Sequence, residues 1–432
     1  MDRSVARLFG RLHVLAVGSR DAESAYDRVR LFDRVRNLLH QSMCPYRTFV
    51  QRSLRTGSGG LETGEKPVEW SVKGSGEYLE GTVWGGLSMV NGPVQVAEEE
   101  SPAATAAEGA GCWVVPVSAF LLTAVILGIV QVVVDPPGLL LERFWEGGGW
   151  LELLVLSGYA AFLAGRLRDP SLRPRWRRRL WRLFSGVFFA QLALGLSGLD
   201  RFLMTGELHL PVPALIAAGP LYRGEGLFMP ILFGATVLLV GPAWCSYLCY
   251  IGAWDGLAAD RRRAPQAMPS WRRPAQVGML VVVVAAALGL RWAGVSSFVA
   301  LMAAVVFGLG GVAVMAAISR RRGVMAHCTT YCPIGVLATR LGRINPLRIR
   351  LGEGCDGCGA CSRACRYDAL RPADIERRRP GSACTLCGDC VPRCREGHMD
   401  YSFPGLDAGK AAALFVVLVA ALHAAFLGVA RI

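Results

Sequence analysis

The cysteines of this 432-residue chain have a spacing that could hold metal. The segments CDGCGACSRAC, residues 355–365, and CTLCGDCVPRC, residues 384–394, share one pattern, C-x-x-C-x-x-C-x-x-x-C. A short loop with this spacing can place three thiolates at three corners of an iron–sulfur cube, and the fourth cysteine then belongs to a second cube. The doubled pattern therefore predicts two [4Fe-4S] clusters, whose chemistry is the transfer of single electrons.

Each predicted cluster takes three cysteines from one run and one cysteine from the other run. The first ligand set is Cys355, Cys358, Cys361 and Cys394. The second ligand set is Cys384, Cys387, Cys390 and Cys365. This crossed arrangement is typical of bacterial 2[4Fe-4S] ferredoxins, so residues 346–405 are predicted to form a small α+β ferredoxin domain.

Zinc and disulfide bonds are the alternative uses of these eight cysteines. A structural zinc site needs two pairs of ligands, which leaves the third and fourth cysteines of each run unexplained. Disulfide bonds are rare in a reducing cytoplasm, and the arginine distribution described below places this segment there. Both alternatives therefore fit the spacing less well than iron–sulfur clusters do.

Four further cysteines form two pairs at the ends of apolar segments. Cys245 and Cys249 lie in GPAWCSYLCYIGAWDG, and Cys328 and Cys332 lie in HCTTYCPIGVLAT. An i, i+4 spacing in a helix places both thiols of a pair on one face, and two such helix ends could meet and offer four thiolates to one site. Three interpretations remain open, namely a third redox or metal centre, a reversible disulfide, and the packing of cysteine as a small apolar side chain.

The composition indicates a membrane protein. Hydrophobic residues make up 53% of the chain and its mean hydropathy is +0.36, which is too apolar for a set of soluble domains. A helix of about 20 apolar residues crosses a bilayer. Seven segments are predicted to do so, and they are 114–134, 150–165, 181–199, 227–244, 275–292, 296–318 and 411–430. The apolar segment 211–219 is too short to cross and is predicted to be part of a loop or a re-entrant piece.

Arginine placement predicts the orientation of these spans. The chain has 47 Lys+Arg against 33 Asp+Glu, and its arginine-rich connections are 166–182, 260–273 and 319–323. With seven spans all three connections fall on one side, which the positive-inside rule makes cytoplasmic. The N-terminus is then inside and the C-terminus outside. Because topology accounts for the excess of positive charge, nucleic acid is not an expected partner.

The predicted fold class is mainly α, a polytopic helical membrane protein of about seven spans with its N-terminus inside. The cytoplasmic two-cluster ferredoxin domain lies between the last two spans. Four parts are predicted. Residues 1–112 form a cytoplasmic N-terminal region of unknown function, and residues 113–345 form a transmembrane bundle with two membrane-edge cysteine pairs. Residues 346–405 form the ferredoxin domain, and residues 406–432 form a C-terminal transmembrane helix.

The N-terminal region offers no chemistry that we can assign. Residues 24–56 predict a basic amphipathic helix, and residues 57–96 contain short runs that could form small strands. Residues 97–111 are predicted to be a linker.

Two histidines elsewhere have alternative uses. His327, next to Cys328, could bind a cluster or carry a quinol proton, and His423 lies inside the last predicted span. For both residues, a histidine satisfied by ordinary hydrogen bonds is the alternative. We identify no catalytic residue.

The paired C-x-x-x-C motifs at span ends, followed by the doubled cluster motif, resemble the NapH/NosR-type family of membrane-bound polyferredoxins. The resemblance covers residues 180–404, and CPIGVLATRLGRINPLRIRLGEGCDGCGACSRAC is its most specific part. It implies a protein of the bacterial inner membrane that exchanges electrons with the quinone pool and with a respiratory redox protein or enzyme complex. Tyr250 stands where the family has proline, and we find no flavin-attachment motif in residues 1–112, so FMN is not expected.

We therefore expect a membrane iron–sulfur electron-transfer protein with two [4Fe-4S] clusters, surrounded by membrane lipid and using quinone. Whether it is an enzyme stays open: the resemblance allows the role of a quinol dehydrogenase subunit, and no independent hydrolase or transferase site is visible. The alternative, again implied by the resemblance, is a NosR-like maturation or regulatory factor for a respiratory metalloenzyme. A structural anchor whose clusters only stabilise the fold is the third hypothesis.

Overall fold

The structure is a computed structural model that describes residues 68–73, 78–83, 102–135, 137–202 and 210–429. The chain divides into two compact units, one of residues 44–110 and one that contains residues 111–432. Each unit is described by itself. The predicted amphipathic helix of residues 24–56 lies outside the described residues.

The first unit contains an antiparallel hairpin. Strand β1, Val68–Lys73, pairs with strand β2, Tyr78–Val83, so that Val68 lies opposite Val83. The short strands predicted within residues 57–96 are therefore present. Helix α4, Pro102–Val133, begins inside the predicted linker, so the linker prediction is wrong from Pro102 onward. The alanines of PAATAAEGA favour a helix, and proline is well tolerated at its first position.

Six helical segments in the described part of the chain are long and apolar enough to cross a membrane, which is consistent with a multi-pass membrane protein. They correspond to six of the seven predicted spans. The segments are Trp113–Val133 of α4, Gly148–Arg168 (α5), Phe228–Leu248, which begins with α8 (Phe228–Val240), Arg272–Trp292 (α10), Ser297–Arg322, which begins with α11 (Ser297–Val314), and Ala408–Val429 (α16). Large apolar side chains such as Val281 and Val306 are exposed on the outer faces of these helices, as lipid contact requires.

Helix α6, Arg173–Leu196, contains most of the seventh predicted span, 181–199. It does not qualify as a span by composition, because its first ten residues include six arginines. The helix nevertheless packs against α5 and α16 and buries Trp181 and Phe184. A seventh crossing and the inside position of the N-terminus stay predictions.

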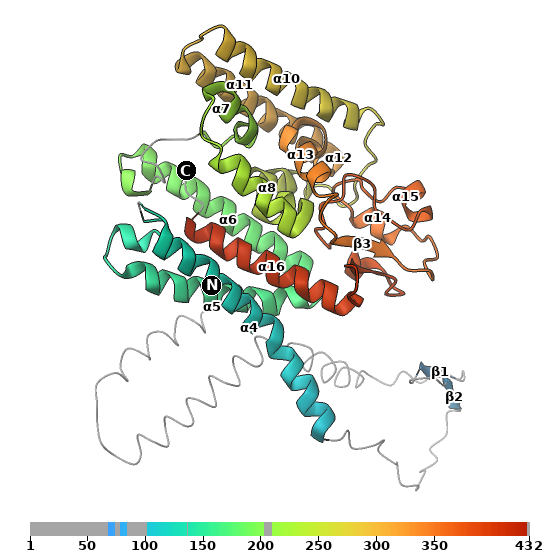
Figure 1. The fold of residues 1–432 in the computed structure, drawn as a ribbon. Helices are drawn as coiled ribbons and strands as arrows, with labels where there is room; N and C mark the ends of the chain where they lie inside the picture. Colours follow the sequence, from blue (N-terminus) through green and yellow to red (C-terminus); the bar gives the residue numbers. More distant parts are fainter. Residues whose placement is uncertain (1–67, 74–77, 84–101, 136, 203–209, 430–432) are drawn as a thin grey trace, which may run out of the picture. The chain divides into compact units, whose positions relative to one another are not determined.

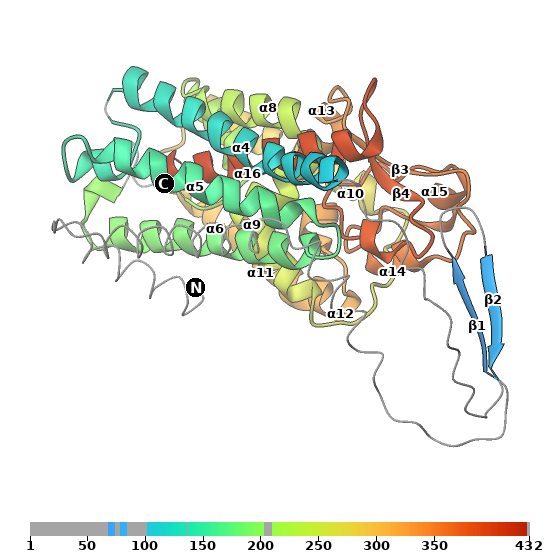
Figure 2. The same cartoon turned by 90° about the horizontal axis from the view of Figure 1, so that it is seen from below.

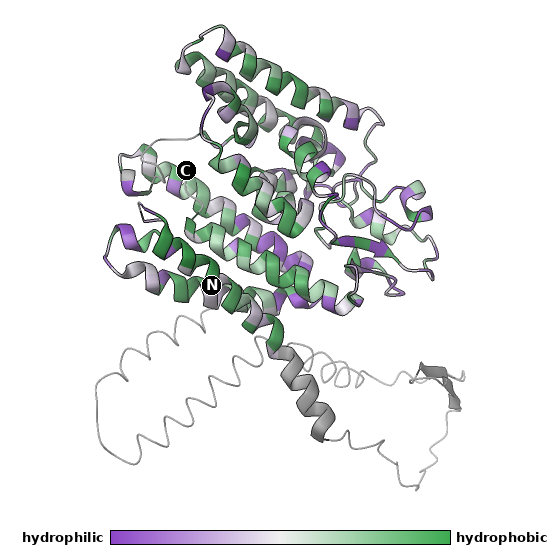
Figure 3. Cartoon of the chain, in the orientation of Figure 1, coloured by the Kyte–Doolittle hydropathy of each residue, from purple (hydrophilic) through white to green (hydrophobic). Residues whose placement is uncertain are grey.

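The long helices lie side by side in a bundle (Figures 1 and 2), in which α16 makes its most extensive contact with α5. Hydrophobic colour follows the long helices along most of their length, whereas hydrophilic residues are concentrated toward helix ends and in the adjoining small domain (Figure 3). Helix α7, Leu215–Arg223, is too short to cross, as predicted, and packs against α10. The prediction of a loop is wrong from Leu215 onward, because these residues are helical.

The small domain, residues 346–405, lies at one end of the bundle (Figures 1 and 2). Its strands β3, Arg348–Leu351, and β4, Met399–Ser402, pair antiparallel, and the cysteine loops lie between them in sequence. The domain also contains the short helices α14 (Ala360–Ala364), α15 (Pro372–Glu376) and η7 (Val391–Arg393). One buried apolar core continues from the bundle into this domain, which fixes the cysteine loops against the helix ends.

Candidate iron–sulfur centres

The first predicted ligand set comes together around one cavity of about 310 Å³. Two glycines with positive φ, Gly357 at 74° and Gly359 at 68°, make the tight turns that bring the first three cysteines to it. His398 and Asp356 also line this cavity. The four cysteines at the cavity are Cys355, Cys358, Cys361 and Cys394. We refer to them as the outer set, because Cys358 is exposed.

The second predicted ligand set lies deeper in the protein than the outer set does. Cys390 is buried, and its thiol lies close enough to the other three, Cys365, Cys384 and Cys387, for their charges to interact. Burial raises the pKa of Cys384 and of Cys387 to about 12, and the Ala369 N–H donates to Cys365 Sγ at 3.2 Å. Such thiols are protonated at neutral pH unless a metal displaces their protons. We refer to these four residues as the inner set.

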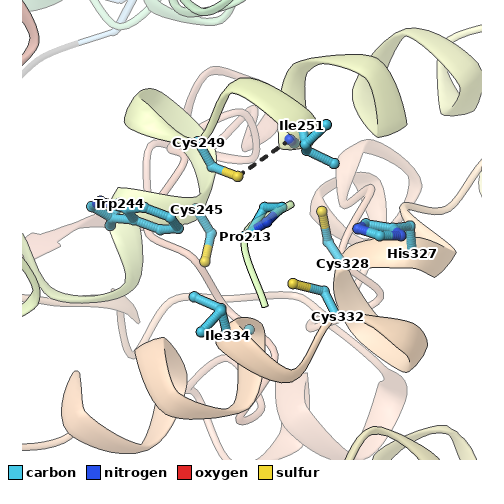
Figure 4. A pocket seen from close by; sticks show the side chains of 11 residues that line it. Pro213, Trp244, Cys245, Cys249, Ile251, His327, Cys328, Cys332 and Ile334 are labelled. Atoms are coloured by element: carbon cyan, nitrogen blue, oxygen red, sulfur yellow. Dashed lines mark hydrogen bonds between the residues drawn. The ribbon is translucent and has the colours of Figure 1, made fainter. Parts of the chain in front are cut away.

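The four membrane-edge cysteines also converge (Figure 4). Cys245, Cys249, Cys328 and Cys332 line one cavity of about 290 Å³, together with apolar side chains from the surrounding elements. The predicted meeting of two helix ends is therefore present. The predicted geometry within each pair is wrong, since the first cysteines lie in the π-helical turns η4, Trp244–Leu248, and η6, His327–Tyr331. The second cysteines are extended and begin helices α9, Tyr250–Ala259, and α13, Pro333–Leu341.

Among the residues that the structure describes, no three His, Cys, Asp or Glu side chains converge as ligands of a single metal ion. In a cluster each thiolate binds a separate iron atom, so the thiolates surround a space instead of meeting at one point. The outer and membrane-edge groups of cysteines surround such a space.

The inner set is bound directly to the first membrane-edge turn. The Ser246 hydroxyl donates to the Thr385 carbonyl at 2.9 Å, and the Tyr247 hydroxyl donates to the Cys387 carbonyl at 3.0 Å. Ser246 and Tyr247 are two of the three residues between Cys245 and Cys249. The turn at the membrane edge therefore holds the loop of the inner set.

A buried ion pair reinforces this contact. The Arg177 Nε atom lies 2.9 Å from Asp389 Oδ1, and Arg177 Nη1 donates to the Ser246 carbonyl at 3.2 Å. Asp389 stands between Cys387 and Cys390, so one guanidinium holds both the cysteine loop and the membrane-edge turn. The sequence did not single out Arg177, because it is one of many arginines in that connection. The signal that could have found it is its spacing four residues before Trp181, which places both side chains on one helix face.

Replacement of Tyr247 by phenylalanine tests this contact. We expect the loop of residues 384–390 to open more easily, because the Cys387 carbonyl loses its donor, at a cost of about 1 kcal/mol. Amide hydrogen exchange in that loop should become roughly fivefold faster. Tyr222→Phe is the control. It removes a comparable hydrogen bond, which the Tyr222 hydroxyl donates to the Val295 carbonyl at 2.7 Å just after the C-terminal end of α10. Equal exchange in both variants would contradict the prediction.

The two histidines have different surroundings. His423 is fully buried and satisfied, with Nε2 3.1 Å from the Leu180 carbonyl and Nδ1 3.4 Å from the Tyr159 hydroxyl. His327 is buried at the membrane-edge cavity, and its ring lies against Tyr331 with centroids 5.5 Å apart. His423 therefore fits the structural alternative, whereas His327 is part of the wall of the cavity.

Comparison with known proteins places 4Fe-4S binding on this chain. Residues 224–266 match the family described as "4Fe-4S binding domain". The chain carries a ferredoxin-type iron–sulfur domain. The matched residues include Cys245 and Cys249 and lie before both cysteine runs of the small domain. Over 233 residues the chain is 28% identical to the methylamine utilization ferredoxin-type protein MauN of Paracoccus denitrificans (strain Pd 1222). The matched region covers 49% of this chain and 72% of MauN. No solved structure matches the chain.

Proposed function

We propose that this protein is a membrane-bound electron carrier that holds one [4Fe-4S] cluster in the inner set and one in the outer set. It passes electrons between the quinone pool and a redox partner, as the resemblance to NapH/NosR-type polyferredoxins implies. The observation that carries the proposal is the gathering of both crossed cysteine sets in one small domain, bound through buried contacts to the end of an apolar helix bundle.

The residues present fit the two clusters. The outer set surrounds a cavity, and the inner thiols are buried with raised pKa values, so that bound iron would replace their protons. The Ala369 N–H group aimed at Cys365 is the kind of donor that stabilises a cluster sulfur. Each bound cluster would accept or release one electron at a time.

The arginines favour a cytoplasmic position for the small domain in a bacterial inner membrane. Arg168 at the end of α5, Arg173 at the start of α6, Arg272 at the start of α10 and the segment Arg320–Arg322 all belong to the helix ends that adjoin this domain. The positive-inside rule assigns such ends to the cytoplasm. A redox partner would then dock at the exposed edge of the outer set, near Cys358.

Quinol oxidation provides a balanced source of electrons for this path. One quinol becomes quinone by releasing two protons and two electrons, and each one-electron centre accepts those electrons singly. The name of the MauN relative, a ferredoxin-type protein, supports an electron-transfer role of this kind.

Replacement of Cys387 by serine in the full-length protein tests the proposal. We expect the anaerobically purified variant to lose about four irons and about four sulfides per chain, which is one cluster. Reduction of the outer-set cluster by a quinol analogue in membranes should become at least tenfold slower. Cys44→Ser, which changes a cysteine outside all three groups, should keep the wild-type iron content and rate.

Two results would contradict the proposal. A wild-type protein without iron in the small domain would remove the clusters. Normal respiratory electron flux in a deletion strain, combined with an unmetallated partner enzyme, would favour a maturation factor over an electron carrier.

A further inference from the structure

The two membrane-edge turns have the same local structure, although they lie far apart in the sequence. In each, a five-residue π-helical turn ends at an extended cysteine, Cys249 with φ −80° and ψ 115° and Cys332 with φ −71° and ψ 117°. A helix begins at the next residue in both cases. Single π-helical turns are rare and frequently occur at functional sites. Both of these turns line the same cavity, so the two copies contribute to one site.

A glycine permits each turn to close. A Cβ atom on Gly252 would lie 2.9 Å from the Cys245 carbonyl oxygen, and one on Gly335 would lie 2.6 Å from the Cys328 carbonyl oxygen. In each copy the glycine therefore lies against the backbone of the first cysteine. A side chain at either position would push the two cysteines of its pair apart.

Side chains from two long helices hold the turns in equivalent ways. Trp181 Nε1 of α6 donates to the Cys249 carbonyl at 2.7 Å, and Gln276 Nε2 of α10 donates to the Cys332 carbonyl at 3.0 Å. Gln276 also donates to the Cys328 carbonyl at 2.7 Å. The carbonyl of the second cysteine is thus satisfied in both copies, and its thiol is left to point into the cavity (Figure 4).

Backbone amides face the sulfur atoms as they do at the inner set. The Gly252 N–H donates to Cys249 Sγ at 3.4 Å, and the backbone amides of Ile334 and Gly335 face the Cys332 sulfur in the same way. Amide donors aimed at a sulfur favour the thiolate, which is the form that binds metal.

The four membrane-edge thiols lie around one space, as the four thiols of the outer set do. The outer set has the ligand spacing of a [4Fe-4S] cluster, so the membrane-edge group shares the arrangement of four thiols around a space that such a cluster needs. Four thiols from two turns surround this space in Figure 4.

We propose that Cys245, Cys249, Cys328 and Cys332 hold a third [4Fe-4S] cluster, with two ligands from each turn. The match to a 4Fe-4S binding domain over residues 224–266 includes the first of these turns, which supports the proposal independently of the small domain.

The place of this centre in electron transfer rests on the proposed function. Tyr247 of the first turn donates to the backbone of Cys387 in the inner set, so the third centre lies between the apolar bundle and the inner set. The order is then membrane-edge centre, inner set, outer set and exposed Cys358. Each group of cysteines would hold a cluster that takes up one electron and releases it to the next group, with no bond or proton exchanged.

Iron and acid-labile sulfide content of the anaerobically purified full chain tests the third centre. We expect about twelve irons per wild-type chain, and about eight in both Cys245→Ser and Cys332→Ser, which change one ligand in each turn. Cys112→Ser is the matched control and should keep about twelve, because it lies outside all three groups of cysteines. Spin quantitation of the fully reduced wild-type protein should show three paramagnetic centres, which is informative even if a variant fails to fold.

The outcomes separate this proposal from the proposed function. A wild-type chain with about eight irons and two reduced centres, together with unchanged iron in Cys245→Ser and Cys332→Ser, would overturn the third cluster and leave the two ferredoxin clusters in place. The iron content of the Cys387→Ser variant tests the proposed function separately from the third cluster.

Discussion

Replacement of Arg177 by methionine should destabilise the protein by about 3–5 kcal/mol, which is the usual cost of leaving a buried charge without its partner. The Arg177 and Asp389 side chains are only 5% and 11% exposed. Methionine keeps the length of the side chain but leaves the Asp389 carboxylate and the Ser246 carbonyl without their donor. The apparent unfolding temperature in detergent should fall on the order of 10 °C.

The loss of stability in Arg177→Met should be seen first in the small domain. Arg177 joins the loop of the inner set to the membrane-edge turn, so its removal frees that loop while the distant helices keep their packing. We expect iron to leave the inner set faster than the outer set when a chelator is added. A rate of iron loss equal to that of the wild type would contradict the role assigned to Arg177.

Arg182→Met is the matched control. Arg182 lies on the same helix and is within 3.5 Å of Asp260, but the two side chains are 49% and 34% exposed. Exposed pairs contribute about 0–1 kcal/mol, so this variant should unfold at nearly the wild-type temperature. Asp389→Asn added to Arg177→Met should recover part of the stability, because the unpaired charge is then removed.

Replacement of Gly335 by alanine should destabilise the protein by about 1–3 kcal/mol and remove the membrane-edge centre. The new Cβ atom would lie 2.6 Å from both the Cys328 carbonyl oxygen and Gln276 Nε2. A backbone carbonyl cannot rotate away, so the turn must open and Cys328 must move. The sign of the change in stability is informative, because replacing glycine by alanine inside an ordinary helix stabilises it by about 1 kcal/mol. Iron content and unfolding temperature measure the two effects.

Gly278→Ala and Gly289→Ala in α10 are the controls for this variant. Neither position has an atom within 4 Å of the added Cβ. Both variants should be as stable as the wild type or more so, with unchanged iron content. A Gly335→Ala protein as stable as these controls, with its full iron content, would show that the turn tolerates a side chain and that the contact distances do not matter.

The sequence predicted the features that depend on local spacing. Three cysteines within one short loop are constrained by covalent geometry, so the crossed pattern predicted which four residues meet in each of two sets, and the structure gathers both. Apolar runs of about 20 residues likewise predicted six of the segments that could cross a membrane. Helix α6 is the exception, because its arginines mix buried and exposed positions and composition alone cannot separate them.

The linker prediction was wrong for a related reason. Alanine, glycine, glutamate and proline are common in linkers, but an alanine-rich segment joined to an apolar helix continues that helix, as α4 does from Pro102. Helix propensity adds over many residues once a helix has begun, and a compositional rule does not include this cooperativity.

Only the tertiary structure decided the membrane-edge site. The spacing of Cys245 and Cys249 allowed an ordinary helical face, whereas the fold makes a π-helical turn closed by Gly252 and opposes it to a second turn built in the same way. The Arg177–Asp389 pair and the Tyr247 contact join segments that are distant in sequence. Such contacts depend on how several helices pack around one core. The sequence by itself predicted two sets of four cysteines as cluster ligands, and packing decided that Cys245, Cys249, Cys328 and Cys332 surround a common space beside the inner set.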